Sequence, residues 1–227
     1  MRCLDVGCGG GDVTLDLART VAPGGRAVGM DIDEVKLEMA RAEATSAGVG
    51  NVEFRAADVA GTAGGEAFDV VYARFLLTHL PDPASALRNM WENTRPGGVI
   101  AVEDIDFTGS FCSPRSDAYD AYVDLYTRTV QARGADPNIG PRLPSLLAGV
   151  GCERIAMNVV QPAGIRGEVK LMAAITMENI IDAVLAEKLA TEDQVAGVVR
   201  QLYELAEDDC TAMSVPRVVQ AWGYRPG

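Results

Sequence analysis

Short apolar runs alternate with amphipathic stretches through the first hundred residues of the chain. The runs predict strands, and the stretches with apolar positions three or four residues apart predict helices. Strands that alternate with helices in this way form a doubly wound, parallel α/β sheet. The predicted strands are Cys3–Val6, Ala27–Asp31, Val52–Ala56, Phe68–Tyr72 and Val99–Val102, with helices over 13–21, 33–47 and 82–93 among them.

The second half of the chain has a less regular pattern, in which helices predominate. Thr191 and Gln194 have the spacing of a capping box, so a helix is expected to begin between them. Tyr119, Tyr122 and Tyr126 recur at helical spacing in an earlier stretch. The predicted helices are 116–133, 143–147, 168–189 and 192–206, and the predicted strands are 154–160 and 213–222.

Four glycines within five positions follow the first predicted strand, in Asp5-Val6-Gly7-Cys8-Gly9-Gly10-Gly11-Asp12. Such a loop lets the backbone contact a ligand at the N-terminus of the next helix. A dinucleotide loop would need a third glycine where Asp12 stands, and Asp12 is predicted to cap the helix instead. Acidic residues on both sides of the loop favour a ligand with an ammonium or sulfonium group. The alternative is a glycine-rich turn that binds nothing.

Two further carboxylates follow predicted strands at the edge of the sheet that carries this loop. Asp31 ends the second strand about twenty residues beyond the loop, the usual interval for an acid that binds ribose hydroxyls. Its alternative role is helix capping, although Asp33 already stands at the cap position. Asp58 follows the third strand and could accept a hydrogen bond from an adenine amino group; its alternative is a solvated loop residue.

Together these segments resemble a class I S-adenosylmethionine-dependent methyltransferase of the small-molecule type, similar to the enzymes of quinone and natural-product biosynthesis. The likeness is specific over roughly residues 1–105. The matching stretches are Leu4–Gly11, Val28–Asp33, Ala57–Val59, Phe68–Tyr72, Leu76–Asp82 and Arg95–Ile100.

The resemblance implies a Rossmann-like α/β fold with a doubly wound, seven-stranded, mostly parallel sheet, an antiparallel last strand and helical lid insertions. It implies one methyltransferase domain over 1–227, of which 1–110 form the cofactor-binding half. Residues 111–140 and 165–209 would be the lid insertions, and 141–164 and 210–227 would complete the sheet. The family usually has a helical segment before the first strand. Met1 adjoins that strand here, so we expect either a fragment or a more open cofactor pocket.

The resemblance also assigns residues to the methionine part of S-adenosylmethionine. The backbones of Gly7, Cys8 and Gly9 would contact the methionine chain, and Asp5 would support its ammonium end. Arg74, just after the fourth strand, would border the sulfonium. Metal-assisted catechol methyltransferases usually have an Asp at the position of Arg74, so no metal is expected.

A second set of residues would bind the nucleoside part of the same cofactor. Asp31 would hold the ribose, and Ile32 would lie against the adenine face. Asp58 and the Val59 amide would bind the adenine edge.

His79, the chain's single histidine, is the candidate catalytic base because it lies at the same edge of the sheet. Its unperturbed pKa suits proton transfer near neutral pH. The alternative is a structural histidine that bonds loop backbone. The tyrosine helix either covers the acceptor pocket or packs its stripe on the sheet. Glu103, Asp104 and Asp106 are expected to be solvated loop carboxylates, and the alternative is that they bind a cation.

The composition of the chain limits the classes of binding partner and the cellular compartment that are expected. A net charge of −12 and a pI near 4.5 disfavour nucleic acid and anionic membrane surfaces. Five scattered cysteines suggest neither a zinc site nor a disulfide framework, so a cytoplasmic protein is expected. The partners expected are a small-molecule acceptor and a second copy in a homodimer.

The expected function is methyl transfer from S-adenosylmethionine to an aromatic, quinone-like or polyketide-like small molecule, at oxygen or carbon. Two alternatives use the same fold. One is an enzyme that catalyses another reaction, such as cyclisation, and the other is a regulatory domain that binds the cofactor without activity.

Overall fold

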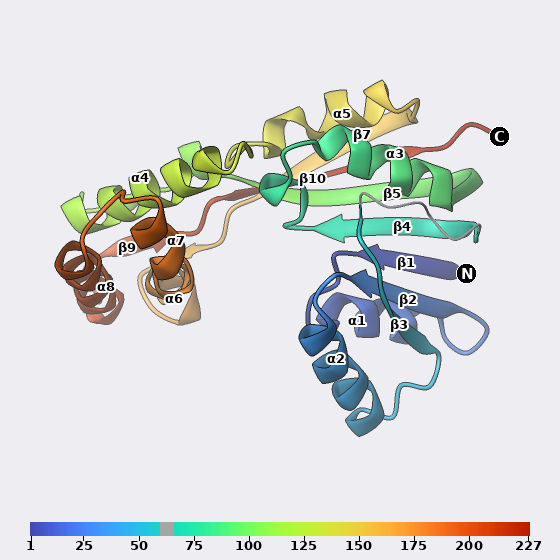
Figure 1. Cartoon of the computed structure of the whole chain (residues 1–227), viewed down its shortest axis with the longest axis horizontal. Coiled ribbons are helices and arrows are strands. Elements are labelled where there is room, and N and C mark those ends of the chain that lie inside the picture. The colour runs from blue at the N-terminus through green and yellow to red at the C-terminus, as the bar shows by residue number, and fades with distance from the viewer. Residues whose placement is uncertain (60–65) are drawn as a thin grey trace.

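The computed structural model describes residues 1–59 and 66–227, and a seven-stranded sheet runs through it (Figure 1). The strand order is β3-β2-β1-β4-β5-β10-β7. The strands from β1 to β5 are parallel, and β10 is antiparallel to both of its neighbours, which confirms the predicted fold class. The bounds are β1 (Arg2–Val6), β2 (Arg26–Asp31), β3 (Val52–Ala56), β4 (Phe68–Arg74), β5 (Thr94–Asp106), β7 (Glu153–Val160) and β10 (Arg217–Tyr224).

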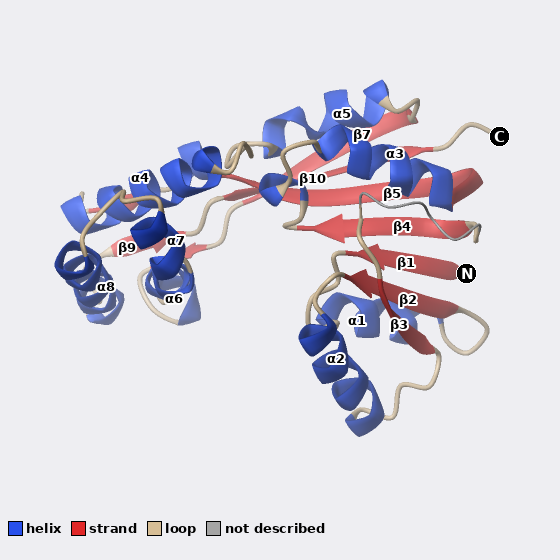
Figure 2. Ribbon diagram, in the orientation of Figure 1, coloured by secondary structure: helices blue, strands red, loops and turns tan. Residues whose placement is uncertain are grey.

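Helices cover the two faces of this sheet, as Figure 2 shows. The helices α1 (Asp12–Val21) and α2 (Glu34–Ser46) pack on the β1–β3 part of one face. The opposite face carries α3 (Pro83–Asn93) and α5 (Leu143–Gly149). Side chains alternate between the faces of a strand, so apolar residues on successive strands build a core under α3 and α5. Its centre includes Leu4, Val28, Val71, Ile100 and Leu87.

A group of helices beyond the carboxyl ends of β4 and β5 has a core of its own (Figure 1). We call this group the helical unit: α4 (Asp117–Ala132), α6 (Met172–Asn179), α7 (Ile181–Ala186) and α8 (Glu192–Glu207). Phe107, Tyr122, Met177 and Leu202 are buried in its core. A small antiparallel sheet joins the unit to the rest of the chain and was not predicted; it consists of β6 (Cys112–Ser113), β8 (Ala163–Gly164) and β9 (Ala212–Ser214).

Two predicted elements of the second half are interrupted in the structure. The helix expected over 168–189 is a 3-10 turn, Glu168–Lys170, followed by α6 and α7. The buried Lys170 ammonium donates hydrogen bonds to the carbonyls of Ile165 and Asp208, which anchors this turn. The strand expected over 213–222 is split into β9 and β10 around Pro216, because proline cannot donate a ladder hydrogen bond.

The cap of α1 also differs from the prediction, whereas two other caps are confirmed. Gly11, with φ 81°, is the N-cap residue, and Asp12 is the first residue of the helix and caps nothing. The Asp12 carboxylate forms an ion pair with Arg74 instead. Asp33 caps α2 as predicted, and the capping box at the start of α8 is present.

The tight fit at Gly11 generates a prediction for stability. A Cβ there would lie 2.7 Å from Phe54 Cε1 and 2.8 Å from Ala40 Cβ, and φ is positive, whereas a Cβ at Gly10 would meet nothing within 4 Å. Gly11→Ala should therefore lower the free energy of unfolding by about 2 kcal/mol. Gly10→Ala should change it by less than about 0.5 kcal/mol. Urea unfolding measures both, and equal losses would contradict this packing.

Candidate functional site

The glycine loop is held against the end of β2 by its own backbone. The amides of Gly7 and Cys8 donate to the Met30 carbonyl at 2.7 and 2.9 Å. The Gly9 amide donates to Asp31 Oδ2 at 2.8 Å, and Asp33 N donates to Asp31 Oδ1 at 2.9 Å. Gly7 and Gly9 have φ values of 72° and 52°, which glycine adopts without a steric penalty. The Asp31 carboxylate is thereby oriented at the edge of the loop.

A small cavity of about 110 Å³ lies between this loop and the end of β4, lined by Asp5, Gly7, Cys8, Asp12, Val13, Arg74 and Phe75. Asp5 is buried, and its Oδ2 accepts a 2.6 Å hydrogen bond from the Thr14 hydroxyl. Burial raises the pKa of the Asp5 carboxyl to about 6, although the Thr14 bond opposes that rise. Arg74 and Asp12 form an ion pair of 2.7 Å across the cavity. The lining of this cavity therefore contains both carboxylates and a guanidinium.

The predicted nucleoside residues follow the neighbouring strands β2 and β3. Ile32 is 72% exposed, which is unusual for a large apolar side chain and leaves one of its faces available to a ligand. Asp58 is exposed after the end of β3, and the Val59 carbonyl accepts a 2.8 Å hydrogen bond from Asn89 Nδ2. The structure thus brings Asp31, Ile32, Asp58 and Val59 to the same edge of the sheet as the glycine loop.

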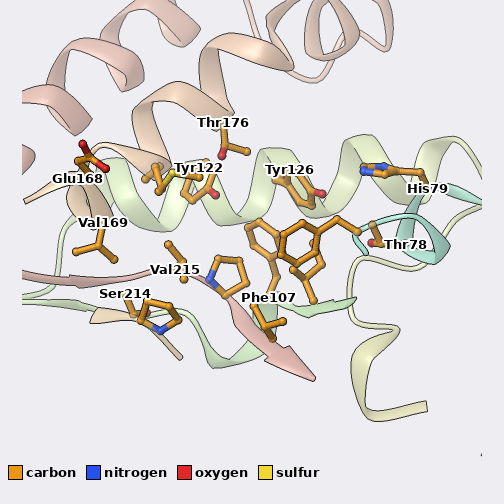
Figure 3. Close-up of a pocket in the computed structure, with 17 residues that line it drawn as sticks. Thr78, His79, Phe107, Tyr122, Tyr126, Glu168, Val169, Thr176, Ser214 and Val215 are labelled. Carbon is orange, nitrogen blue, oxygen red and sulfur yellow. The ribbon is translucent and has the colours of Figure 1, made fainter. Parts of the chain in front are cut away.

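A larger cavity of about 470 Å³ opens between the carboxyl ends of β4 and β5 and the helical unit (Figure 3). Most of its lining is apolar or aromatic, including Phe75, Ile105, Phe107, Tyr122, Tyr126 and Met172. Phe75 lines both this cavity and the small one, so the two spaces adjoin at this residue. Its φ of 53° is rare for a bulky side chain and was not predictable from the sequence pattern.

A buried carboxylate fixes the turn that follows Phe75. Asp104 accepts hydrogen bonds from the amides of Thr78 at 3.0 Å and Ile105 at 2.9 Å, and also from the Leu77 amide. Burial raises the pKa of the Asp104 carboxyl to about 6, against the effect of these bonds. The Phe75 amide donates to the Glu103 carbonyl at 2.9 Å.

The expectation that Glu103, Asp104 and Asp106 are solvated loop residues is wrong. Pairing with β10 extends β5 through Asp106, so all three belong to a strand. Asp104 and Asp106 are 1% and 3% exposed, and Asp106 forms an ion pair with Arg217. Glu103 accepts a 2.8 Å hydrogen bond from the Tyr72 hydroxyl.

His79 lies at the rim of the large cavity, on the 3-10 turn Leu77–His79. Its side chain is exposed on one side, yet the partial loss of water around the ring lowers its pKa. The positive charges of Arg133 and Lys36 lower it further, so the imidazole is neutral at pH 7. The ring forms no hydrogen bond with the part of the chain that the structure describes, which leaves both nitrogens available to a ligand.

The tyrosine helix, α4, contacts α6, α7 and α8, and its side chains reach the large cavity. Tyr122 and Tyr126 line that cavity, as Figure 3 shows, whereas the Tyr119 hydroxyl donates to the Ser214 carbonyl at 2.6 Å. The Tyr126 ring stacks on Phe107 with 4.0 Å between the ring centroids. The tyrosine stripe thus packs in the core of the helical unit and not on the sheet, and two of its members form part of the cavity wall.

Within residues 1–59 and 66–227, no group of three or more His, Cys, Asp or Glu side chains is arranged to hold a metal ion. Over the same residues, no helix combines the length and the apolar character needed to cross a bilayer.

Comparison with known proteins agrees with this geometry. A family model described as a methyltransferase domain matches residues 1–132. A trans-aconitate 2-methyltransferase of Deinococcus radiodurans is 31% identical over 173 residues, which cover 73% of this chain and 64% of that protein. A ubiquinone/menaquinone biosynthesis C-methyltransferase of an Enterobacter strain is 36% identical over 121 residues, covering 52% of this chain and 47% of that protein. The chain thus spans less than two thirds of the length of either relative.

Solved structures share the fold over the whole chain. A putative methyltransferase of Bacillus halodurans superimposes with a TM-score of 0.66 at 20% identity, covering 100% of this chain and 93% of that one. A Haemonchus contortus phosphoethanolamine N-methyltransferase, solved with S-adenosylhomocysteine, gives a TM-score of 0.61 at 16% identity. The match covers 100% of this chain and 49% of that one.

The sheet order, the glycine loop and the carboxylate at the end of β2 define the class of nucleotide-cofactor proteins with a Rossmann-like sheet. Within that class, the chain belongs to the S-adenosylmethionine-dependent methyltransferase family. The resemblance found in the sequence is thereby confirmed.

The contacts of Asp104 generate a prediction for the turn that carries His79. Asp104→Ala would leave the amides of Leu77, Thr78 and Ile105 buried without an acceptor, at a cost of about 2 kcal/mol. Hydrogen exchange at the Leu77 and Thr78 amides should become at least about tenfold faster. Glu103→Ala is the matched control, because that side chain contacts Tyr72 and not the turn. Equal exchange rates in the two variants would show that Asp104 does not hold the turn.

Proposed function

We propose that this chain transfers a methyl group from S-adenosylmethionine to a small, aromatic, quinone-like or polyketide-like acceptor, at oxygen or carbon. The observation that carries the proposal is the position of Phe75, which lines both the small cavity at the glycine loop and the large apolar cavity. A cofactor at the loop and an acceptor in the large cavity would meet at this residue.

The lining of the small cavity supports placing the amino acid end of the cofactor there. That end carries an ammonium and a carboxylate, and the lining supplies carboxylates from Asp5 and Asp12 and a guanidinium from Arg74. We assign the ammonium to Asp5 and the methionine carboxylate to Arg74, whose guanidinium then also borders the sulfonium. The backbones of Gly7, Cys8 and Gly9 would contact the methionine chain.

The nucleoside part would lie along the ends of β2 and β3. The free lone pairs of Asp31 would accept hydrogen bonds from the ribose hydroxyls, since Gly9 and Asp33 already orient this carboxylate. Ile32 would cover one face of the adenine, and its exposure leaves room for that contact. Asp58 and the Val59 amide would bind the adenine edge.

The large cavity favours an acceptor without strong negative charge. The ionisable groups of its described lining are His79, Glu168 and the phenols of Tyr122 and Tyr126, and no Lys or Arg is among them. A tricarboxylate such as the substrate in the name of the Deinococcus relative would lack a cationic partner there. Apolar and aromatic walls instead suit a ring system.

Catalysis would depend mainly on alignment. S-adenosylmethionine supplies a methyl group on a positively charged sulfur and is therefore already activated. The chain's task is to hold the acceptor in line and exclude water, which contributes roughly 7–11 kcal/mol to lowering a barrier. The neutral imidazole of His79 would accept a proton from the acceptor, an effect worth about 10²–10⁴-fold in rate.

The proposal also covers the cellular compartment and the oligomeric state of the protein. All five cysteines are free thiols, as expected in the cytoplasm. We infer a cytoplasmic enzyme that acts on a small molecule, and the predicted homodimer would be tested by sedimentation.

The test combines a binding and a transfer measurement. We expect S-adenosylhomocysteine to bind in calorimetry and tritiated methyl groups from S-adenosylmethionine to be transferred to an acceptor from a panel of hydroxylated aromatics and quinones. Binding without transfer to any acceptor would indicate one of the alternatives, a different reaction on the same fold or a regulatory domain. Absence of binding would reject the proposal.

The ribose contact predicts the effect of one substitution. Asp31→Asn keeps the size of the side chain and removes its charge, so S-adenosylhomocysteine should bind about 10- to 100-fold more weakly. Asp16→Ala is the control, because Asp16 is exposed on α1 and its carboxylate pairs with Arg19 on the same helix. Calorimetry measures the affinity of both variants for S-adenosylhomocysteine. Equal affinities of the two variants would exclude Asp31 from the ribose site.

The raised pKa of Asp5 predicts how cofactor affinity depends on pH. Below about pH 6 this carboxyl is protonated, and only its ionised form attracts the ammonium. Affinity for S-adenosylhomocysteine should therefore rise about tenfold from pH 5 to pH 7 and then level off. Asp5→Asn should bind weakly at both values with a flat profile. Calorimetry across this range tests the assignment, which a flat wild-type profile would contradict.

A further inference from the structure

The hydroxyl of Tyr126 differs from that of Tyr119, which lies two turns earlier on α4. The Tyr119 hydroxyl donates to the Ser214 carbonyl at 2.6 Å. The Tyr126 hydroxyl has no hydrogen-bond partner among the described residues, and it is not one of the atoms sealed from solvent without a partner. It therefore opens into the large cavity that the residue lines.

The ring of Tyr126 is fixed in place, so this hydroxyl has a defined direction. The residue is 6% exposed, and its ring stacks on Phe107. Figure 3 shows the hydroxyl directed toward the end of the cavity where His79 lies. Phe75, which lies just before the turn that carries His79, also lines this cavity and is shared with the small cavity. The hydroxyl of Thr78, which lies on the same turn as His79, donates to the Asp136 carbonyl at 3.0 Å.

The protonation states give these two side chains opposite hydrogen-bonding roles. Burial and the nearby charge of Asp104 raise the pKa of Tyr126 to about 12, so its hydroxyl remains a donor at neutral pH. Burial and the charges of Arg133 and Lys36 lower the pKa of His79, so its imidazole has a free acceptor nitrogen. One donor and one acceptor thus line the same end of a mostly apolar cavity.

We propose that Tyr126 and His79 together select an acceptor with an enolic hydroxyl next to a carbonyl, as in a hydroxyquinone or a 3-hydroxychromone. The acceptor's carbonyl oxygen would accept from the Tyr126 hydroxyl, while its own hydroxyl would donate to His79. This inference rests on the proposed function and narrows its substrate class to a vicinal hydroxy-enone.

The same pair accounts for the charges that develop during transfer. The acceptor's O–H bond breaks, and its proton goes to the imidazole nitrogen of His79. The electron pair left on the acceptor oxygen forms the new bond to the methyl carbon, while the carbon–sulfur bond breaks and its electron pair stays on sulfur. The Tyr126 hydroxyl stabilises the enolate before attack, and the exposed side of His79 returns the proton to water.

The test compares two isomeric probes that differ only in the position of the hydroxyl, together with a parent compound that lacks it. Protein saturated with S-adenosylhomocysteine is titrated with 3-hydroxychromone, with 6-hydroxychromone and with chromone, and binding is followed by probe fluorescence or calorimetry. We expect 3-hydroxychromone to bind at least about tenfold more tightly than the other two. Because all three probes fill similar volumes, this preference reports the donor–acceptor pair rather than apolar burial.

Two variants locate the preference on the protein. Tyr126→Phe should reduce it to less than about threefold, whereas Tyr119→Phe should retain it, because the Tyr119 hydroxyl donates to the Ser214 carbonyl and the residue does not line the cavity. Both variants should bind S-adenosylhomocysteine as the wild type does, since neither residue lines the small cavity.

The outcomes separate this inference from the proposed function. Equal affinity of the wild type for the two isomers, or a preference that survives in Tyr126→Phe, overturns the inference while cofactor binding stands. Loss of S-adenosylhomocysteine binding by the wild type overturns the proposed function itself. The wild-type comparison alone is decisive should Tyr126→Phe fail to fold.

Discussion

The buried carboxylate of Asp104 is the contact on which the arrangement of the site depends. It stands near the end of β5 and holds the amides of the turn that follows β4. This turn carries His79 and is preceded by Phe75, so one side chain sets the position of both residues at the junction of the two cavities. A buried ionised group is costly unless its hydrogen bonds are satisfied, and here backbone amides supply them. The rigidity of the turn follows from that requirement.

The cofactor side of the site could be predicted from the sequence because its signals are local. The glycines after β1 and the acid at the end of β2 act through backbone conformation and through strand ends, which short patterns specify. The sheet was predictable for the same reason, since each strand is a short apolar run. Asp12 was predicted to be the N-cap residue of α1, a position that Gly11 occupies. The sequence did not show that Arg74 lies within reach of the Asp12 carboxylate.

The acceptor side could not be predicted in the same way because its signals are distant in sequence. Asp104 is buried because β10, more than a hundred residues later in the chain, pairs along the whole end of β5. Phe75 has a left-handed backbone conformation, which no pattern of residues in the sequence predicts. The helix expected over 168–189 is broken where the Lys170 ammonium donates to the Asp208 carbonyl at the end of α8. Hydrophobic periodicity does not reveal this contact. Tyrosine spacing indicated a helix over the cavity but not which hydroxyl remains unbonded.

The separate cores of the sheet and the helical unit have a consequence for how such proteins diverge. Side chains such as Tyr122, Met177 and Leu202 pack among themselves and not against the apolar residues under α3 and α5. Changes that remodel the wall of the large cavity can therefore accumulate without loosening the glycine loop or the strands that hold it. The match to a methyltransferase domain over residues 1–132 includes that loop and ends with α4, before most of the helical unit. Such a chain can change its acceptor over evolutionary time while keeping its methyl donor.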